Sequence, residues 1–300
     1  MNHNHHHDTS HYNRSFAIGV TLNVIFVAVE AFYGVHADSL ALIADAGHNL
    51  SDVLSLLMAW GASLLAARAA TERRTYGFRK ATIMAALASA IMLLVALGGI
   101  AWEAIGRLFD PGPVEGATVI LVAAVGVVIN TLTALLFLKG PKEDLNIRAA
   151  FLHMAADAAV SAGVVVAGIL IMAQGWPWID PVVSLIIVAV IFIGTWALLR
   201  DSLNYAIDAV PKSVDIPGIK LYLLGFDRVE RIHDLHVWPL STTEIALTVH
   251  LVVADKTLDN RFLLDLRDHL HDHFGIGHTT IQVESCDAEN GCRLDRDACC

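Results

Sequence analysis

The chain has 300 residues, of which 55% are hydrophobic and only 17% are charged, and its formal net charge is −10. Soluble globular domains carry about a quarter charged residues, so the composition argues against a soluble domain over the whole length. The negative net charge argues against a nucleic-acid partner, and the position of all four cysteines in the last fifteen residues excludes a disulfide framework for a folded domain.

Long apolar runs fill the chain from residue 15 to about residue 200. Each run has about the twenty residues that a helix needs to cross the hydrocarbon core of a bilayer. We therefore predict an α-helical membrane protein with six transmembrane helices. They are Ser15–Val35, Leu40–Ala67, Ala81–Leu108, Ala117–Leu138, Arg148–Ala173 and Pro181–Leu199. A histidine-rich tail over residues 1–14 precedes this transmembrane domain, which is assigned to residues 15–207.

Basic residues are distributed asymmetrically among the connections between these helices. The connections 36–39, 109–116 and 174–180 carry no Lys or Arg, whereas 68–80 and 139–147 are rich in them. Cytoplasmic loops carry the excess of Lys and Arg in membrane proteins. Both termini are therefore predicted to lie in the cytoplasm, in a multi-pass protein of a bacterial inner membrane.

After Asp208 the pattern changes to that of a small α+β domain, assigned to residues 208–285 and predicted to be cytoplasmic. The expected elements are a helix near Pro217–Leu224, strands Val229–Val237 and Ile245–Val253, a helix over Thr257–His273 and a strand Thr279–Glu284. Residues 286–300 form a cysteine-containing tail. Alternation along the second and third strands places His250 and Glu284 on the face opposite the apolar side chains.

Ionisable side chains within the predicted membrane helices need a functional reason, because each costs at least a few kcal/mol in a bilayer. The second helix holds His48 and Asp52, and the fifth holds His153 and Asp157, each pair spaced by four residues. Residues at this spacing share one helix face. Two such faces in contact would converge two imidazoles and two carboxylates, a ligand set that suits tetrahedral zinc and disfavours magnesium or calcium.

The predicted metal site has one structural alternative, and a transport function for it has two functional alternatives. A single His–Asp pair is equally well explained as a polar contact between helices, but two identical copies favour a metal site. Ligand histidines must be neutral and aspartates ionised, so metal binding releases protons, and a site open to each side in turn would be an antiporter. A membrane metalloenzyme is less well supported, because four protein ligands leave no position for a catalytic water. A membrane metal sensor that binds without transport is the other alternative.

Four segments carry a resemblance to a known family: Ser39–Asp52, Tyr76–Phe78, Asp144–Asp157 and His233–Trp238. Through them the sequence resembles the cation diffusion facilitators, a family of metal–proton antiporters. The resemblance implies a homodimer of six-helix protomers, each with a cytoplasmic domain shaped like a small metallochaperone. It also implies that zinc or cadmium is the transported ion. The transport site it implies is His48, Asp52, His153 and Asp157.

The resemblance extends to the cytoplasmic domain. Similar family members bind metal there with His233, His250 and an acid at the position of Glu284, and His278 is a further candidate. Gln282 stands where the two-metal version has a histidine, so at most one well-formed metal is expected. The alternative is a set of solvated polar residues on a sheet face.

Three further expectations concern single side chains and the tails. The resemblance implies an ion pair between Lys80 and Asp208, lying partly out of water. Asn23, Glu30 and Asn130 lie in the predicted spans, where they would make hydrogen bonds between helices or line a water path. The terminal histidines and cysteines could gather metal or be incidental.

Overall fold

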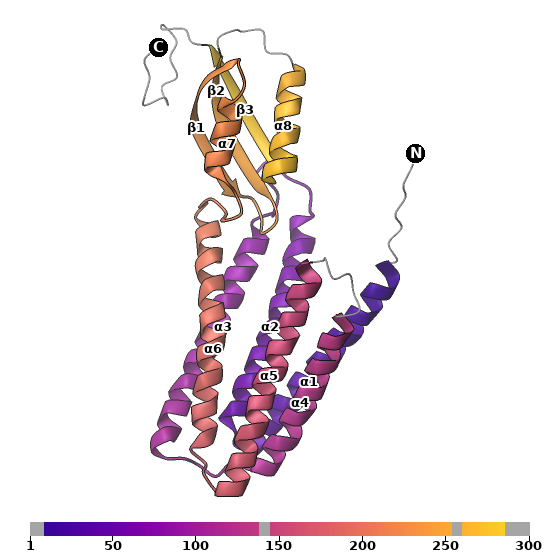
Figure 1. Ribbon diagram of the computed structural model, residues 1–300, viewed down its shortest axis with the longest axis vertical. Helices are drawn as coiled ribbons and strands as arrows, with labels where there is room; N and C mark the ends of the chain where they lie inside the picture. Colours follow the sequence, from indigo (N-terminus) through magenta and orange to yellow (C-terminus); the bar gives the residue numbers. More distant parts are fainter. Residues whose placement is uncertain (1–8, 138–144, 254–259, 286–300) are drawn as a thin grey trace. The chain divides into compact units, whose positions relative to one another are not determined.

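A computed structural model describes residues 9–137, 145–253 and 260–285 (Figure 1). Six long helices come first: α1 (Thr9–His36), α2 (Leu40–Ala66), α3 (Ala81–Phe109), α4 (Gly116–Phe137), α5 (Leu145–Gln174) and α6 (Ile179–Ala206). The remaining elements are α7 (Ile216–Leu224), β1 (Val229–Pro239), β2 (Ile245–Val253), α8 (Asn260–Phe274) and β3 (His278–Ser285). The predicted fold class, a helical membrane domain followed by a small α+β domain, is confirmed. Two compact units make up the chain, one over 1–58 and 88–198 and the other over 59–87 and 199–300.

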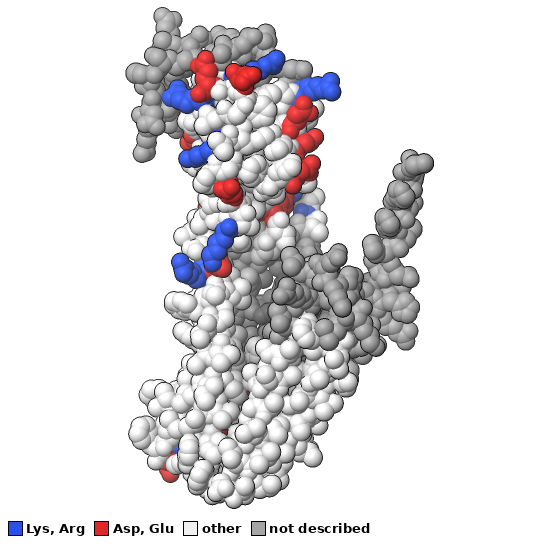
Figure 2. Space-filling view, in the orientation of Figure 1, with Lys and Arg blue, Asp and Glu red and all other residues white. Residues whose placement is uncertain are grey.

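The long helices have the surface of membrane-spanning segments. Ala81–Phe109, Gly116–Leu135, Met154–Gln174 and Ile179–Ala206 are each long and apolar enough to cross a bilayer. Large apolar side chains such as Trp102, Leu121 and Ile193 are exposed on them, and the charged side chains gather instead over the α+β part (Figure 2). Helix α6 continues past its predicted end at Leu199 to Ala206. Hydropathy marks only the lipid-facing length, whereas the helical hydrogen bonds continue through the polar residues that follow.

Close helix packing in the first unit depends on small residues. A Cβ at Gly116 would lie 3.0 Å from the carbonyl oxygen of Gly168, where α4 crosses α5. A Cβ at Gly126 would lie 2.7 Å from Cζ of Phe26 in α1. In lipid, where no hydrophobic effect drives helices together, such close backbone approach is the main source of packing energy.

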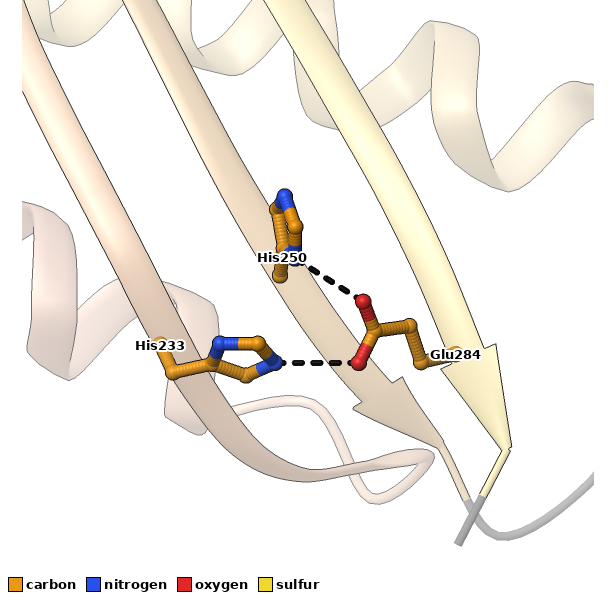
Figure 3. A group of neighbouring side chains, drawn as sticks. All are labelled: His233, His250 and Glu284. Atoms are coloured by element: carbon orange, nitrogen blue, oxygen red, sulfur yellow. Dashed lines mark hydrogen bonds and ion pairs between the residues drawn. The ribbon is translucent and has the colours of Figure 1, made fainter. Parts of the chain in front are cut away.

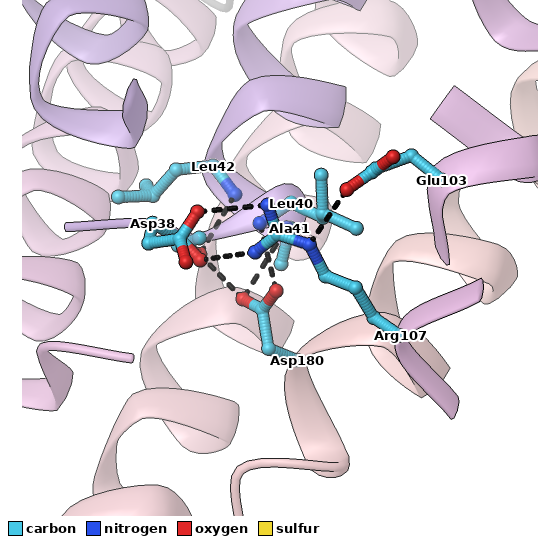
Figure 4. A network of polar contacts seen from close by, with 8 residues as sticks. Asp38, Leu40, Ala41, Leu42, Glu103, Arg107 and Asp180 are labelled. Atoms are coloured by element: carbon cyan, nitrogen blue, oxygen red, sulfur yellow. Dashed lines mark hydrogen bonds and ion pairs between the residues drawn. The ribbon is translucent and has the colours of Figure 1, made fainter. Parts of the chain in front are cut away.

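The first turn of α2 is held by a carboxylate from another helix (Figure 4). Asp180, at the start of α6, is 1% exposed. It accepts hydrogen bonds from the Ser39 hydroxyl, from the Leu40 amide at 2.7 Å and from the Ala41 amide at 3.3 Å. These amides have no partner within their own helix, and a negative charge at a helix N-terminus is favourable.

Arg107 of α3 secures the residue that precedes this turn. Its guanidinium donates to the carbonyl oxygen of Asp38 at 2.8 Å, to the Asp38 carboxylate at 2.7 Å and to Glu103 at 3.1 Å. Asp38 has φ of +52°, a left-handed conformation that Asp tolerates better than most residues. The connection between α1 and α2 is thus tied to both α3 and α6.

Asp180→Ala should destabilise the protein substantially, because it leaves three buried donors without an acceptor. We expect the free energy of unfolding in detergent to fall by about 2–4 kcal/mol, as measured by thermal or denaturant unfolding. Asp201→Ala is the matched control, since it removes an exposed carboxylate of the same helix that pairs with Lys212. Equal effects of the two substitutions would contradict the role given to Asp180.

The α+β domain is a three-stranded sheet in the order β1-β2-β3, with β1 and β2 antiparallel and β2 and β3 parallel. The parallel connection runs through α8, as a crossover between parallel strands requires. The apolar sheet face, with Leu247, Val249 and Leu251, packs against Leu266 and Leu270 of α8 in one buried core. The opposite face is therefore available to polar side chains, as the strand alternation predicts.

The second unit also contains the chain that leads into α3. Lys80 Nζ lies 2.7 Å from Asp208 Oδ1, so the predicted ion pair is confirmed, but the two side chains are 46% and 50% exposed. The expectation that it lies partly out of water refers to the dimer, and it stays a prediction. Next to it, Arg79 pairs with Glu244 of the β1–β2 turn, and the amide of Thr242 donates to the Thr82 hydroxyl at 3.1 Å.

Because the Lys80–Asp208 pair is half exposed, its contribution should be that of a surface pair, about 0–1 kcal/mol. Lys80→Ala and Asp208→Ala should each lower the free energy of unfolding within that range, and Lys80→Asp with Asp208→Lys should recover most of the loss. Denaturant unfolding of the singles and the double swap measures the coupling. A much larger single loss would mean that a second chain desolvates the pair.

Candidate metal sites

The described side chains of the predicted membrane site meet across α2 and α5. His48 Nε2 lies 3.2 Å from Asp157 Oδ1, and the two side chains are 15% and 2% exposed. The side chains of Asp52 and His153 lie outside the described part of the structure. Half of the predicted ligand set is thus in contact, from two helices that are far apart in the sequence.

The contacts between α2 and α5 show how the two helices are aligned. Ser161 donates to Asp45 Oδ2 at 2.8 Å, and His48 contacts Asp157. As the residue number rises in α2 it falls in α5, so the helices are antiparallel. One further turn along both helices brings backbone positions 52 and 153 opposite each other.

A second buried polar layer lies one turn before His48, and the predicted site did not include it. Glu30 and Asp45 are both fully buried, and Asn49 donates to Glu30 Oε2 at 3.3 Å. Glu30 thus makes the interhelical hydrogen bond that was one of the two roles considered for it. Asn130 is also buried, and the side chain of Asn23 lies outside the described residues. The sequence signal for Asp45 was its spacing of three residues from His48, which also gives one helix face.

The α+β domain brings three of its predicted ligands together on the polar face of the sheet (Figure 3). His233 Nε2 lies 3.0 Å from Glu284 Oε2, and His250 Nδ1 lies 2.8 Å from Glu284 Oε1. One donor atom of each residue falls within 4.8 Å of the others. The side chains are 9%, 12% and 17% exposed in the order His233, His250 and Glu284. We call these three residues the sheet cluster.

Strand register explains why the sheet cluster forms. His233 of β1 is directly opposite His250 of β2, and His250 is opposite Gln282 of β3. Glu284 is the next residue of β3 on the same face, since alternate residues of a strand share a face. Gln282 donates to Glu284 Oε1 at 2.8 Å, so it orients the carboxylate. Two imidazoles and a carboxylate match the ligands of a zinc ion with one open position.

Asp234 is a neighbour of the sheet cluster that the sequence interpretation missed. The β1–β2 register is interrupted between His233 and His236, and Asp234 has φ of +49°. This bulge turns its carboxylate toward His250 Nε2, 3.6 Å away, and His236 Nε2 lies 2.9 Å from its other oxygen. The contact with His236 holds the pKa of the Asp234 carboxyl below its usual value. The group is therefore anionic at neutral pH and favours a cation nearby.

His278 does not join the sheet cluster. It pairs with Ala246 at the first position of β3, six residues from Glu284, which is about 20 Å along a strand. Its ring instead meets Tyr76 edge to face, with centroids 5.5 Å apart. Strand alternation placed His278 on the correct face but gave no distance along the strand.

Comparison with known proteins agrees with the fold. The family model of the cation efflux transmembrane domain matches residues 16–205, and that of the cation efflux protein cytoplasmic domain matches residues 211–286. The chain therefore belongs to the cation diffusion facilitator family. It is a membrane protein for efflux of divalent metal cations, and not an enzyme.

Several relatives match over almost the full length. The metal cation efflux system protein CzcD of Cupriavidus metallidurans is 35% identical, with 96% of this chain and 91% of the relative covered. The zinc transporter ZitB of Shigella flexneri is 36% identical, with 95% and 93% covered. The cadmium, cobalt and zinc/H(+)-K(+) antiporter of Bacillus subtilis is 33% identical, with 95% and 92% covered. A solved metal-bound C-terminal domain of the Cupriavidus CzcD transporter is 37% identical, with a TM-score of 0.22, and covers 24% of this chain and 99% of that one.

Glu284→Ala should lower the affinity of the sheet cluster for zinc by at least about tenfold, because it removes the carboxylate shared by both histidines. Gln282→Ala removes only the hydrogen bond that orients Glu284, so its effect should be smaller. Zinc titration of the purified full-length protein against a chromophoric chelator measures both. An effect of Gln282→Ala as large as that of Glu284→Ala would mean that Gln282 itself binds the ion.

Proposed function

We propose that the protein exports zinc in exchange for protons, through a site formed by His48, Asp52, His153 and Asp157. The observation that carries this proposal is the largely buried contact between His48 of α2 and Asp157 of α5. The printed names of the relatives support zinc as cargo, with cadmium and cobalt as further ions.

The geometry of the His48–Asp157 contact links metal to protons. An imidazole nitrogen 3.2 Å from a carboxylate oxygen has a hydrogen between them. Zinc binds the same nitrogen and oxygen lone pairs, so the shared hydrogen must leave this contact before the ion can take its place. A site that loads zinc on one side and protons on the other exchanges them as it turns between the two sides.

The arrangement in the membrane follows from the same features. We assign both termini and the α+β domain to the cytoplasmic side of a bacterial inner membrane, since the connections 68–80 and 139–147 carry Lys and Arg and those of the other side carry none. The protein acts as a homodimer, in keeping with the family to which its C-terminal domain belongs. In the sheet cluster, His233, His250 and Glu284 bind one divalent ion in the cytoplasm.

Asp157→Ala should abolish zinc transport and leave the protein folded and inserted, because it removes one of the two carboxylate ligands and the contact that joins α2 to α5. Zinc flux into proteoliposomes measures the effect, and size-exclusion chromatography checks the fold. Asp201→Ala, which removes an exposed carboxylate, should transport normally. Near-normal flux of the Asp157 variant would refute the site assignment. Tight zinc binding by the unchanged protein without any flux would favour a sensor.

Zinc flux should also depend on the proton gradient. In vesicles that hold a pH-sensitive dye, uptake of zinc should move protons in the opposite direction, and collapse of the gradient with an ionophore should slow uptake. Vesicles that contain the Asp157→Ala variant are the control, because they measure any leak of zinc or protons that does not depend on the site. Flux that is indifferent to the gradient, with no proton signal, would refute exchange without refuting the site.

A further inference from the structure

Helix α8 carries three histidines that neither of the sites above uses. His269, His271 and His273 lie in its last turns, and the four-residue spacing of His269 and His273 puts both on one face of the helix. Their ring centroids are 4.0 Å apart and their planes are inclined by 29°. His271 lies elsewhere around the helix, where its Nδ1 is 3.0 Å from Asp272.

The residues around α8 hold the ring of His269 in place, whereas the ring of His273 is exposed. Leu266 and Leu270 are buried against the sheet. Beside them the ring of His269 stacks on Tyr222 of α7, with centroids 3.8 Å apart and planes inclined by 8°. His269 is half-buried and His273 is exposed. One imidazole is thus positioned in advance, which reduces the entropy lost when an ion binds.

Charge at this place favours a cation. Asp265 precedes His269 by one turn on the same helix face. Asp272 is next to His273 in the sequence, and its Oδ1 lies 3.0 Å from Nδ1 of His271. These two carboxylates add negative charge to the end of the helix that carries the histidine pair.

We propose that His269 and His273 form a separate binding site for a transition-metal ion such as Zn²⁺ on the surface of the α+β domain. Two imidazole nitrogens one helical turn apart can each reach an ion at about 2 Å after small side-chain rotations. Water completes its coordination. Imidazole ligands select Zn²⁺, Cu²⁺ or Ni²⁺ over Mg²⁺ and Ca²⁺. Since both histidines belong to one helix, the ion binds without any change in the sheet.

The test is a zinc titration of the full-length protein in detergent against a chromophoric chelator. His250→Ala is present throughout, so that the sheet cluster does not contribute, and the terminal histidines and cysteines are the same in every sample. His269→Ala and His273→Ala should each weaken one zinc-binding event by at least about tenfold. His271→Ala is the matched control, since it removes an exposed histidine of the same helix that lacks an i+4 histidine, and it should change nothing.

A second experiment tests whether the four-residue spacing of the two histidines is itself responsible for zinc binding. Asp265→His combined with His273→Ala builds a new pair at 265 and 269, one turn earlier, and should restore the lost binding. His273 is exposed, so His273→Ala keeps the test valid even if loss of the Tyr222 stack unfolds His269→Ala. Equal losses in the His271 variant, no loss in the His273 variant, or no recovery in the double variant would each overturn the proposal.

Discussion

The carboxylate of Asp180 determines where α2 begins, and the polar contacts deeper in the helical unit depend on that position. It satisfies a hydroxyl and two amides at the first turn of α2, which would otherwise be left without partners in an apolar environment. A helix has no freedom to slide once its first turn is held in this way. His48 lies about two turns further along the same helix. The contacts at the start of α2 therefore also determine the position of His48 along α5.

Below that turn, the described ionisable groups of α2 and the neighbouring Asn49 each meet a polar group from another helix. Asp45 meets Ser161 of α5, Asn49 meets Glu30 of α1, and His48 meets Asp157 of α5. Every such group would cost several kcal/mol in lipid without a partner. The contacts therefore select one rotation and one height of α2 against its neighbours.

The sequence was sufficient to predict features that follow from one repeating pattern of residues. Hydropathy runs predicted the six helices, spacing of four residues predicted that His48 and Asp157 face another helix, and strand alternation placed His250 and Glu284 on the polar face. The sequence did not predict features that depend on tertiary contacts. The trans cap by Asp180 joins residues about 140 positions apart. The bulge at Asp234 interrupts the register of β1, and no alternation argument was available for that strand.

His278 shows a related limit of periodic reasoning. Alternation assigns a residue to a face, but only the register of β3 against β2 assigns it to a place along the strand. In this sheet that register puts Gln282, and not His278, beside His250. The ring of His278 reaches Tyr76 in the connection between α2 and α3, so it lies with the contacts around Lys80 and Glu244 and not with the cluster.

The proposed sites differ in the helices and strands that supply their ligands. This difference decides whether metal binding can change the conformation of the protein. His48 and Asp157 come from two helices, and the sheet cluster takes one ligand from each of three strands. An ion that draws such ligands together also draws together the elements that carry them, so its binding energy can favour one conformation over another. His269 and His273 come from a single helix, whose backbone already fixes their spacing. An ion there has nearly the same affinity in any arrangement of the other elements and therefore cannot shift an equilibrium between them. The helix-surface pair is suited to holding metal near the protein, whereas the sites between elements are suited to coupling metal to movement.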